Sequence, residues 1–375
     1  MLGPRLGPGD FCQVPRPDGW RAAAEQRRHP SPPGLDRRAV ALGPDGSTVF
    51  AVETGRGRSE LVRLATPGRP RRVIHTLDPT PSGRVAQYGS VRFDGRWLVY
   101  EVAHDAANPD DWEIHAWDSA ADTRPFLFRR HDRTVPGPFL FVQAHGGRAA
   151  WTEGASRGGR TAVHVYDLAA RADSVVRTGS LSPVFLAGDT LGWRSQTGPG
   201  RPPVVRAVSL RTGEPVRLPP VIAALRDTAH VAGDGRTWAW VSTDYQILYA
   251  WRPGWREPAL VARAAEGEHI DQMELAGDLI TWVGGRAVWA ADLRGHSRTT
   301  LTPAYGGVVA SGGSLLVTYA AAGPSKDPAQ RGGTTSYVLR TPELAALPAC
   351  PSWRAVPPPV RDPRDPAAEP GAATR

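Results

Sequence analysis

Apolar side chains recur along this chain in short runs that alternate apolar with polar positions. In the clearest runs a glycine is followed five residues later by an aromatic residue, as in Gly95 to Tyr100 and Gly146 to Trp151. The same phrase occupies residues 188–193, 235–240 and 277–282, and weaker copies occupy 46–51 and 313–318. Alternation with period two is typical of a β-strand with two different faces. The pattern predicts a repeated turn and strand, with the glycine at positive φ and the aromatic ring packed between neighbouring repeats.

The spacing of these phrases predicts the architecture. They end at residues 51, 100, 151, 193, 240, 282 and 318, so the repeat averages about 44.5 residues. Each repeat also contains a third and a fourth strand, and four strands in roughly 40–50 residues are typical of a propeller blade. We therefore predict an all-β fold, a seven-bladed β-propeller of four-stranded antiparallel blades over residues 38–350, or six blades if one phrase lies in a loop. The predicted fourth strands include residues 215–218 and, in the last blade, 343–347.

Two segments flank the predicted propeller. Residues 1–37 form a Pro/Arg-rich N-terminal segment that we expect to be partly disordered. We expect neither helix nor strand between residues 11 and 36, because proline removes the backbone donor that both structures use. Residues 351–375 are rich in proline and charge and are predicted to be a disordered tail.

The first repeat resembles a known family. It reads Leu42-Gly-Pro-Asp-Gly-Ser-Thr-Val-Phe-Ala51, and a later repeat reads Val288-Trp-Ala-Ala-Asp-Leu293 before Thr299-Thr-Leu-Thr302. These stretches resemble the Pro-Asp-Gly turn and the closing turn and strand of the TolB-like and WD40-like propeller superfamily of bacteria. The Pro-Asp-Gly signature is intact only in the first repeat. The resemblance implies a propeller fold, which scaffolds, receptors and enzymes share, so the function stays open.

The positive charge of the chain does not indicate nucleic-acid binding. The formal net charge is +8, of which the two flanking segments carry about half, and the body has no basic run with interleaved aromatic residues. No run of 18 apolar residues is present, so we expect no transmembrane segment. The first ten residues lack the continuous apolar stretch of a signal peptide.

The two cysteines stand at opposite ends of the predicted propeller. Cys12 precedes the first blade and Cys350 closes the last one, and these blades are neighbours in a closed ring. The pair is interpreted either as a disulfide that locks the ring or as two unrelated thiols. A disulfide would place the protein in an oxidising compartment, extracytoplasmic or secreted, with an upstream signal peptide missing from this chain. Without one, a cytoplasmic location is expected.

Candidate chemistry is sparse. Ser156 has the glycine spacing of a nucleophile elbow, but that motif needs a strand-to-helix turn on an α/β sheet. About 25 residues follow the last predicted blade, so we expect no fused peptidase domain. Asp118, Asp167 and Asp292 end three third strands and are expected to accept hydrogen bonds from turn amides. His115 and His164 occupy matching third-strand positions and are expected to be structural.

The candidate site is the mouth of the central channel, where the innermost strand of each blade begins. The residues predicted to bind a ligand there are Gln87, Gln143, Arg226, His230, His269, Asp271 and Gln272, with Tyr88 and Asp227 beside them. His230 with Glu268, His269 and Asp271 could hold a divalent metal, an arrangement that resembles the streptogramin-type lyases. Ordinary polar lining of the channel is the alternative, and we predict no metal and no cofactor. The acidic loop 104–111 offers oxygen ligands for calcium but lacks the spacing of a known calcium loop, which favours a solvated loop.

Two functions from different classes remain. The first is a non-catalytic extracytoplasmic propeller that binds a protein, peptide or glycan through its loops. The second is a propeller enzyme, a lyase or hydrolase and possibly metal-dependent, with a site at the channel mouth. The absence of a recognisable catalytic motif favours the first.

Overall fold

The computed structural model describes residues 11–55, 57–78, 86–104, 111–131, 141–154, 160–196, 198, 202–226, 228–320 and 333–350. The predicted residues Ser156 and Asp227, the core of the 104–111 loop and the tail 351–375 lie outside them. The all-β prediction is confirmed, because strands dominate the described chain. No described helix is long and apolar enough to cross a membrane.

Two separate antiparallel sheets follow the N-terminal segment. The first contains β3 (Asp36–Leu42), β4 (Val49–Gly55), β5 (Arg58–Arg63) and β6 (Arg72–Leu77). The second contains β7 (Gln87–Phe93), β8 (Trp97–Ala103), β9 (Trp112–Asp118) and β10 (Phe126–His131).

The middle of the chain forms one larger sheet from three consecutive strand groups. The first group is β11 (Gln143–His145), β12 (Arg148–Gly154), β13 (Thr161–Asp167) and β14 (Ala172–Leu181). The second is β15 (Phe185–Ala187), β16 (Thr190–Gln196) and β17 (Val204–Ser209). The third is β18 (His230–Gly233), β19 (Trp238–Val241), β20 (Ile247–Trp251) and β21 (Ala259–Arg263). Short pairings between β14 and β16 and between β15 and β18 join the groups.

The last two sheets each gain a strand from the N-terminal segment. One contains β22 (Ile270–Ala276), β23 (Leu279–Gly284), β24 (Ala287–Asp292) and β25 (Ser297–Thr302), with β1 (Cys12–Gln13) added in parallel to β25. The other contains β26 (Gly306–Ser311), β27 (Ser314–Ala320) and β28 (Thr334–Arg340), with β2 (Arg28–Pro30) antiparallel to β28. The helices are α1 (Asp18–Gln26), α2 (Pro220–Ala223) and the 3₁₀ helix η2 (Thr341–Glu343).

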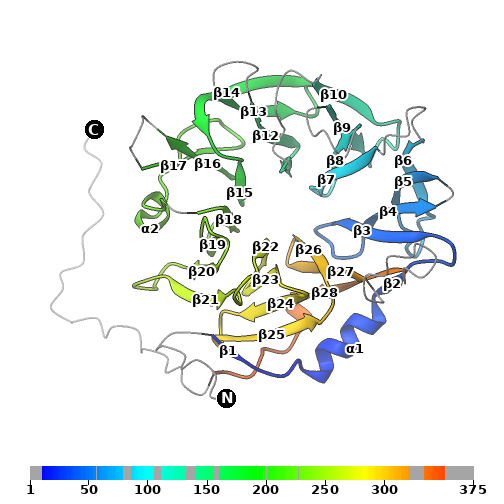
Figure 1. Ribbon diagram of the computed structural model, residues 1–375. Helices are drawn as coiled ribbons and strands as arrows, with labels where there is room; N and C mark the ends of the chain where they lie inside the picture. Colours follow the sequence, from blue (N-terminus) through cyan, green and yellow to red (C-terminus); the bar gives the residue numbers. More distant parts are fainter. Residues whose placement is uncertain are drawn as a thin grey trace, which may run out of the picture.

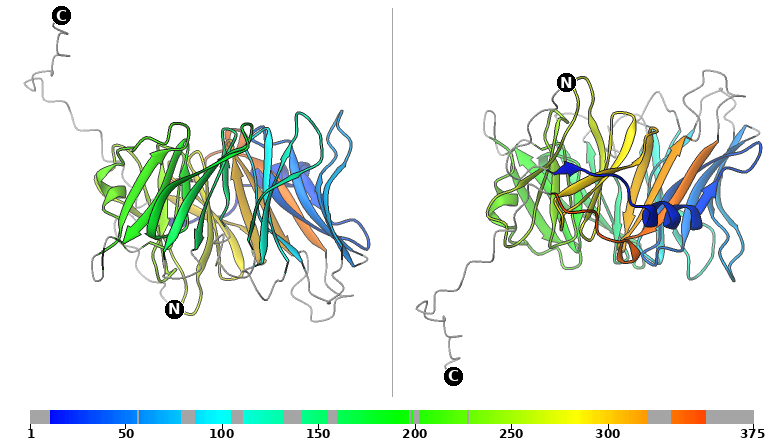
Figure 2. Two further views of the ribbon diagram at one scale, coloured as in Figure 1. Left: turned by 90° about the horizontal axis from the view of Figure 1, so that it is seen from above. Right: turned by 90° about the horizontal axis from the view of Figure 1, so that it is seen from below.

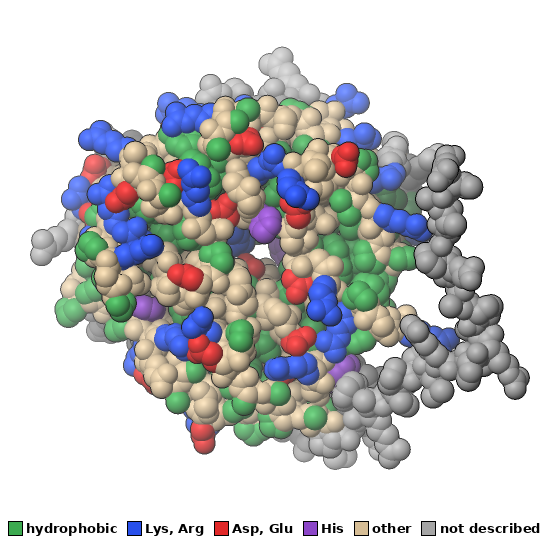
Figure 3. Space-filling view, turned by 180° about the vertical axis from the view of Figure 1, so that it is seen from behind, with side chains coloured by type: hydrophobic (Ala, Val, Ile, Leu, Met, Phe, Trp, Pro, Cys, Tyr) green, Lys and Arg blue, Asp and Glu red, His purple; other side chains and the backbone are tan. Residues whose placement is uncertain are grey.

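The sheets are arranged radially around one axis, as in a β-propeller (Figure 1). Within each strand group the first strand lies nearest the centre and the last lies at the rim. Seen from the side, the strands run across the thickness of a flat disc (Figure 2). A hollow lies at the centre of the face in Figure 3, with histidine and acidic side chains beside it.

The recurring phrase has the two physical roles predicted for it. Its glycine turns the chain between the first and second strands at positive φ, as at Gly95 (106°) and Gly235 (89°). In the same turn Asp94 accepts hydrogen bonds from the amides of Arg96 (2.9 Å) and Trp97 (2.7 Å). Asp45 and Asp234 accept the equivalent bonds in their own turns.

The aromatic residue at the end of the phrase is buried, and in four copies it pairs with a ring on the third strand; Trp193 lies opposite Arg206 instead. Tyr100 stacks on His115 at 5.3 Å between ring centroids, and Trp151 stacks on His164 at 4.9 Å. The same cross-strand pairing joins Trp240 to Tyr249 and Trp282 to Trp289. These aromatic residues also belong to clusters shared with the preceding strand group. The structural roles predicted for His115 and His164 are therefore confirmed, and each ring helps to hold neighbouring sheets together.

The expectation of an unstructured segment between residues 11 and 36 is wrong. This segment contains β1, α1 and β2, and α1 packs against β28 with Trp20 only 1% exposed. The indole of Trp20 donates to the carbonyl of Ala345 at 2.8 Å. The prolines of this segment flank its helix and strands instead of interrupting them. Pro17 precedes the first turn of α1, and Pro30 ends the edge strand β2. Both positions tolerate a missing backbone donor.

Two predicted fourth strands are also wrong. Residues 215–218 contribute only a single bridge between Pro215 and Val208, and α2 follows them with Ile222 buried. Residues 343–347 form no strand, because η2 contains Pro342 and the chain then runs over α1 with Leu344 and Leu347 buried beside Trp20. The fourth-strand position on β28 belongs to β2.

The disulfide between Cys12 and Cys350 is present. Their Cα atoms are 5.6 Å apart although 338 residues separate them in sequence. Both residues are also fixed by backbone bonds to the turn before β25, from Cys12 to His296 (3.2 Å) and from Cys350 to Gly295 (2.9 Å). The bond therefore anchors both ends of the described chain to the same turn.

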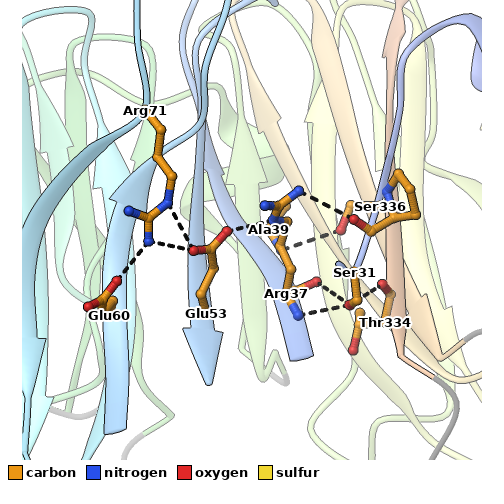
Figure 4. A network of polar contacts seen from close by, with 9 residues as sticks. Ser31, Arg37, Ala39, Glu53, Glu60, Arg71, Thr334 and Ser336 are labelled. Atoms are coloured by element: carbon orange, nitrogen blue, oxygen red, sulfur yellow. Dashed lines mark hydrogen bonds and ion pairs between the residues drawn. The ribbon is translucent and has the colours of Figure 1, made fainter. Parts of the chain in front are cut away.

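A polar network joins β3 to β28, the first full sheet to the last (Figure 4). Ser31 donates its hydroxyl to the carbonyl of Thr334 at 2.6 Å and accepts from the amide of Arg37 at 2.8 Å. The Arg37 side chain then donates to Glu53 at 2.7 Å, and Arg71 bridges Glu53 (2.6 Å) to Glu60 (2.7 Å). Figure 4 shows these side chains in one line between the two sheets.

Candidate functional site

Four rings lie in a row where innermost strands begin, the position that the sequence assigns to the channel mouth. His230 is the first residue of β18, and His269 directly precedes β22. Phe141 lies two residues before β11, and Tyr245 lies in the turn between β19 and β20. Ring centroids are 5.4 Å apart between Phe141 and His230, 5.5 Å between His230 and Tyr245, and 6.4 Å between Tyr245 and His269. We call these four residues the aromatic row.

The aromatic row is accessible to solvent although its rings are largely apolar. Phe141 and Tyr245 are each 37% exposed, and His269 is exposed as well. Successive rings meet edge to face, at interplanar angles of 69°, 68° and 82°. This geometry is favourable between aromatic rings. Exposed rings from separate strand groups that contact each other are a common feature of ligand-binding surfaces.

The turn that carries Tyr245 is held by hydrogen bonds on both sides. The Tyr245 amide donates to the carbonyl of Ser242 at 2.9 Å, and its own carbonyl accepts from the Ile270 amide at 2.9 Å. Asp244 accepts from the Ser242 hydroxyl and from the Gln246 amide (3.1 Å). The turn is therefore fixed to the beginning of β22, which keeps Tyr245 close to His269.

Three glutamine side chains near the row are occupied by bonds within the protein. Gln143 Nε2 donates to the carbonyl of Phe141 at 3.2 Å. Gln246 Nε2 donates to the carbonyl of Glu268 at 2.8 Å and lies 3.2 Å from His269 Nδ1. Gln272 Oε1 accepts from the Val308 amide on β26 at 3.2 Å. Gln143 and Gln246 thus position ring-bearing segments, and Gln272 satisfies an inner-strand amide of the neighbouring sheet.

The charge state of the row is set mainly at His230. Burial lowers the pKa of His230, the positive charge of Arg194 lowers it further, and Asp271 opposes the shift. His230 is therefore uncharged at neutral pH. Asp271 is exposed beside it.

The centre of the ring is crossed by an ion pair. Arg92 on β7 and Glu274 on β22 are 3.2 Å apart, although their sheets are not sequence neighbours. Glu274 is also hydrogen-bonded to the backbone of Ala310 on β26. The pair ties inner strands together across the axis.

The structure connects some of the predicted site residues and separates others. His230 and His269 are linked through Tyr245, Gln143 is linked through Phe141, and Asp271 acts electrostatically on His230. Gln87, at the start of β7, and Arg226, before β18, are exposed, and no contact among the described residues links them to the aromatic row. Within the described ranges, no group of three His, Cys, Asp or Glu side chains could hold a metal ion.

Phe141, Tyr245 and Gln246 were not predicted from the sequence. The available signal was the turn sequence Ser242-Thr-Asp-Tyr-Gln246, in which an aromatic residue occupies a position that usually takes Gly, Asn or Asp. Phe141 precedes a three-residue strand and gives no periodic signal.

A buried acid on β8 differs from the buried acids on the second strands of the neighbouring sheets. Glu53 on β4 and Glu153 on β12 lie one residue further along the repeat than Glu101 does. Burial disfavours their charge, but hydrogen bonds, first from Arg71 and Arg129 respectively, lower the pKa of each overall. Glu101 is 1% exposed and has no arginine partner. Burial raises the pKa of Glu101 to about 7, partly offset by a hydrogen bond from the Ser90 amide, and its second oxygen accepts no bond. Gly89 makes room for this carboxyl, since a Cβ there would lie 2.8 Å from it.

Comparison with known proteins supports the fold alone. No protein family matches the sequence, and no curated protein matches it. Among solved structures, a prolyl endopeptidase aligns with 17% identity and a TM-score of 0.53, covering 88% of this chain and 50% of the endopeptidase chain. An oligogalacturonate lyase from Vibrio parahaemolyticus aligns with 10% identity and a TM-score of 0.51, covering 83% of this chain and 92% of the lyase. An acylaminoacyl peptidase aligns with 9% identity and a TM-score of 0.50, covering 78% of this chain and 51% of the peptidase. The chain thus spans about half the length of the two peptidases, and the likeness is to propeller-type folds.

Proposed function

We propose that this protein is a non-catalytic β-propeller that binds a protein, peptide or glycan ligand at the aromatic row. The observation that carries the proposal is the convergence of four neighbouring rings from three strand groups where inner strands begin, of which Phe141, Tyr245 and His269 are exposed. Exposed aromatic side chains provide large contact areas with few rotatable bonds, so they dominate many binding surfaces. The bonds from Gln143 and Gln246 hold the row in place before a ligand arrives, which reduces the entropy cost of binding.

We propose that the propeller is closed and has seven blades. The strand groups that begin with β3, β7, β11, β15, β18, β22 and β26 are the blades, and β2 completes the last of them. The network from Ser31 through Arg37 to Glu53 supports closure, because it joins the first and last of these groups. An experimental density map with six radial sheets would contradict this count.

We propose an extracytoplasmic location on the basis of the disulfide. A bond between Cys12 and Cys350 is stable in an oxidising compartment and rare in the cytosol. Thiol titration of protein from fractionated cells, under denaturing and non-reducing conditions, tests this. Two free thiols in freshly isolated protein would rule it out.

The aromatic row is tested by ligand screening with a matched control. Wild-type protein is applied to a glycan array and to a peptide array, and binding is compared with Phe141→Ala and Tyr305→Ala. Tyr305 is 62% exposed and lies outside the row, so its loss removes at least as much exposed aromatic surface. We expect Phe141→Ala to abolish the signal and Tyr305→Ala to preserve it. Equal signals from all three proteins would place the ligand elsewhere.

A propeller enzyme is the second candidate, and the uncharged His230 beside Asp271 favours it. A neutral imidazole near a carboxylate can act as a general base, and three similar solved structures are described as two peptidases and a lyase. The candidate catalytic residues are His230, His269 and Asp271. Assays with oligogalacturonate and with prolyl and acylaminoacyl peptides separate the two functions. Turnover that disappears in His230→Ala would replace the binding role with catalysis.

A further inference from the structure

We infer that Tyr245 is the specificity-determining residue of the aromatic row, and that it recognises an apolar or aromatic side chain of a polypeptide ligand. The inference rests on the proposed function and deepens it. It is carried by the backbone conformation of Tyr245 and by the bonds of the polar groups around it.

Tyr245 has a backbone conformation that is unfavourable for its side chain. Its φ is +60°, in the left-handed region where a Cβ crowds the following carbonyl. Gly, Asn or Asp would occupy this turn position with less strain. The bonds of its amide to Ser242 and of its carbonyl to Ile270 hold the residue in this conformation. Strained residues of this kind persist where the surrounding structure enforces them, and they concentrate at functional sites.

The location of Tyr245 separates it from the other strained residues. Asp122, Arg171 and His296 also have positive φ, and each lies in the turn after a third strand. Tyr245 lies in a turn between a second and a third strand, beside the starts of β18 and β22. It is also the member of the row that contacts two other rings from an exposed turn. The strain therefore places an aromatic ring at the surface where the row is accessible.

The bonding around the row favours a polypeptide side chain over a sugar. Gln143 and Gln246 each use Nε2, and Gln272 uses Oε1, for bonds within the protein, so fewer polar groups are left for a ligand at the row. A glycan needs several polar side chains to pair its hydroxyls, and unpaired hydroxyls are costly at a contact surface. Ring faces remain, with the uncharged His230 between Phe141 and Tyr245 at 5.4 and 5.5 Å. An apolar or aromatic side chain laid over His230 would contact all three rings.

The test uses five proteins and a defined peptide probe. Phage displaying random peptides are selected on wild-type protein, and the enriched peptide is synthesised with a fluorescent label. Its affinity is measured by fluorescence anisotropy for wild type, Phe141→Ala, Tyr245→Gly, Tyr245→Phe and Tyr305→Ala, and the melting temperature of each protein is measured in parallel. We expect Tyr245→Gly to raise the melting temperature, because it relieves the strain, and to weaken the peptide by about tenfold or more. Tyr245→Phe keeps the ring and should stay within about threefold of wild type, and Tyr305→Ala should match it.

The outcomes distinguish this inference from the proposed function. If Tyr245→Gly lowers the melting temperature and leaves the peptide affinity unchanged while Phe141→Ala abolishes it, Tyr245 is structural and only the inference fails. If no peptide is enriched but a glycan binds in a manner that depends on Tyr245, the polypeptide assignment is overturned and the site stands. If ligands bind equally to wild type, Phe141→Ala and Tyr245→Gly, the proposed function fails as well.

Discussion

Glu101 is expected to destabilise the folded protein at neutral and alkaline pH, so Glu101→Gln should stabilise it there. The carboxyl is 1% exposed, has no cation beside it, and burial raises its pKa from the usual 4.5 to about 7. This rise in pKa corresponds to roughly 3 kcal/mol between the two protonation states. Glutamine has the same shape and carries no charge at any pH.

The sign of the effect follows from the two protonation equilibria. Below about pH 4.5 the carboxyl is protonated in both the folded and the unfolded chain, so wild type and Glu101→Gln should have similar free energies of unfolding. Between about pH 4.5 and 7 the unfolded chain loses the proton while the folded protein keeps it, and the wild type loses stability as the pH rises. At pH 8 we expect the variant to be more stable by up to about 3 kcal/mol.

The assay is urea unfolding at pH 5 and pH 8, followed by the fluorescence of the 13 tryptophans. The comparison must be between variants, because His75 opposes Glu101 in the wild-type profile: its pKa is lowered to about 4 by burial, so it favours the folded state as the pH rises. Glu153→Gln is the control, because Glu153 is a buried second-strand acid that has an arginine partner. It breaks a buried ion pair with Arg129, 2.9 Å away, and should cost about 3–5 kcal/mol at pH 8. A Glu101→Gln variant that is no more stable at pH 8 than at pH 5, relative to wild type, would refute the reasoning.

Three further outcomes are expected. The double variant Cys12→Ser, Cys350→Ser should lower the free energy of unfolding by at most about 6 kcal/mol, the chain-entropy limit for a 338-residue loop. In thermal melts, a reducing agent should reproduce this loss in the wild type and have no effect on the variant. Asp94→Ala should lower the free energy of unfolding in urea by about 1–3 kcal/mol, because the Asp94 carboxylate accepts from the amides of Arg96, Trp97 and, at 2.7 Å, Gly147 of the next sheet. An unchanged midpoint would show that water replaces all three bonds. Trp20→Ala should lower the free energy of unfolding by about 3–5 kcal/mol and expose the β28 amides to hydrogen exchange, whereas Trp20→Phe should keep these amides protected. Protection that survives in both variants would mean that α1 is not needed to cover β28.

The repeated part of the fold was predictable from the sequence because the same structural requirements recur in successive strand groups. A turn at positive φ favours glycine and packing against the preceding sheet favours a large ring, so Gly95 with Tyr100 and Gly235 with Trp240 have the same spacing. The strands at the outer edges of the sheets were not predictable in this way, because an open sheet edge can pair with any short strand. Nothing within residues 28–30 specifies β28 as their partner, and in α1 only Trp20 and Ala24 carry the helical spacing.

The candidate site was predictable only in part for a related reason. His230 and His269 stand out because a polar, titratable side chain directly precedes an apolar strand. Phe141 and Tyr245 do not, since a single aromatic residue in a turn has no periodic context. The importance of Tyr245 depends on its φ and on the bond from Ile270, which lies on another strand group. Conversely, Gln272 resembles a ligand contact in sequence, but the structure uses it for the amide of Val308.

The pairing of β1 with β25 and of β2 with β28 fixes an order of events during synthesis. The residues of β1 and β2 leave the ribosome before their partner strands, which follow about 300 positions later. The middle strand groups can fold as they emerge, since their contacts are local, but α1 and Trp20 wait for β28. Contacts of such long sequence separation form slowly. Burial of Trp20 therefore means that β28 has been made.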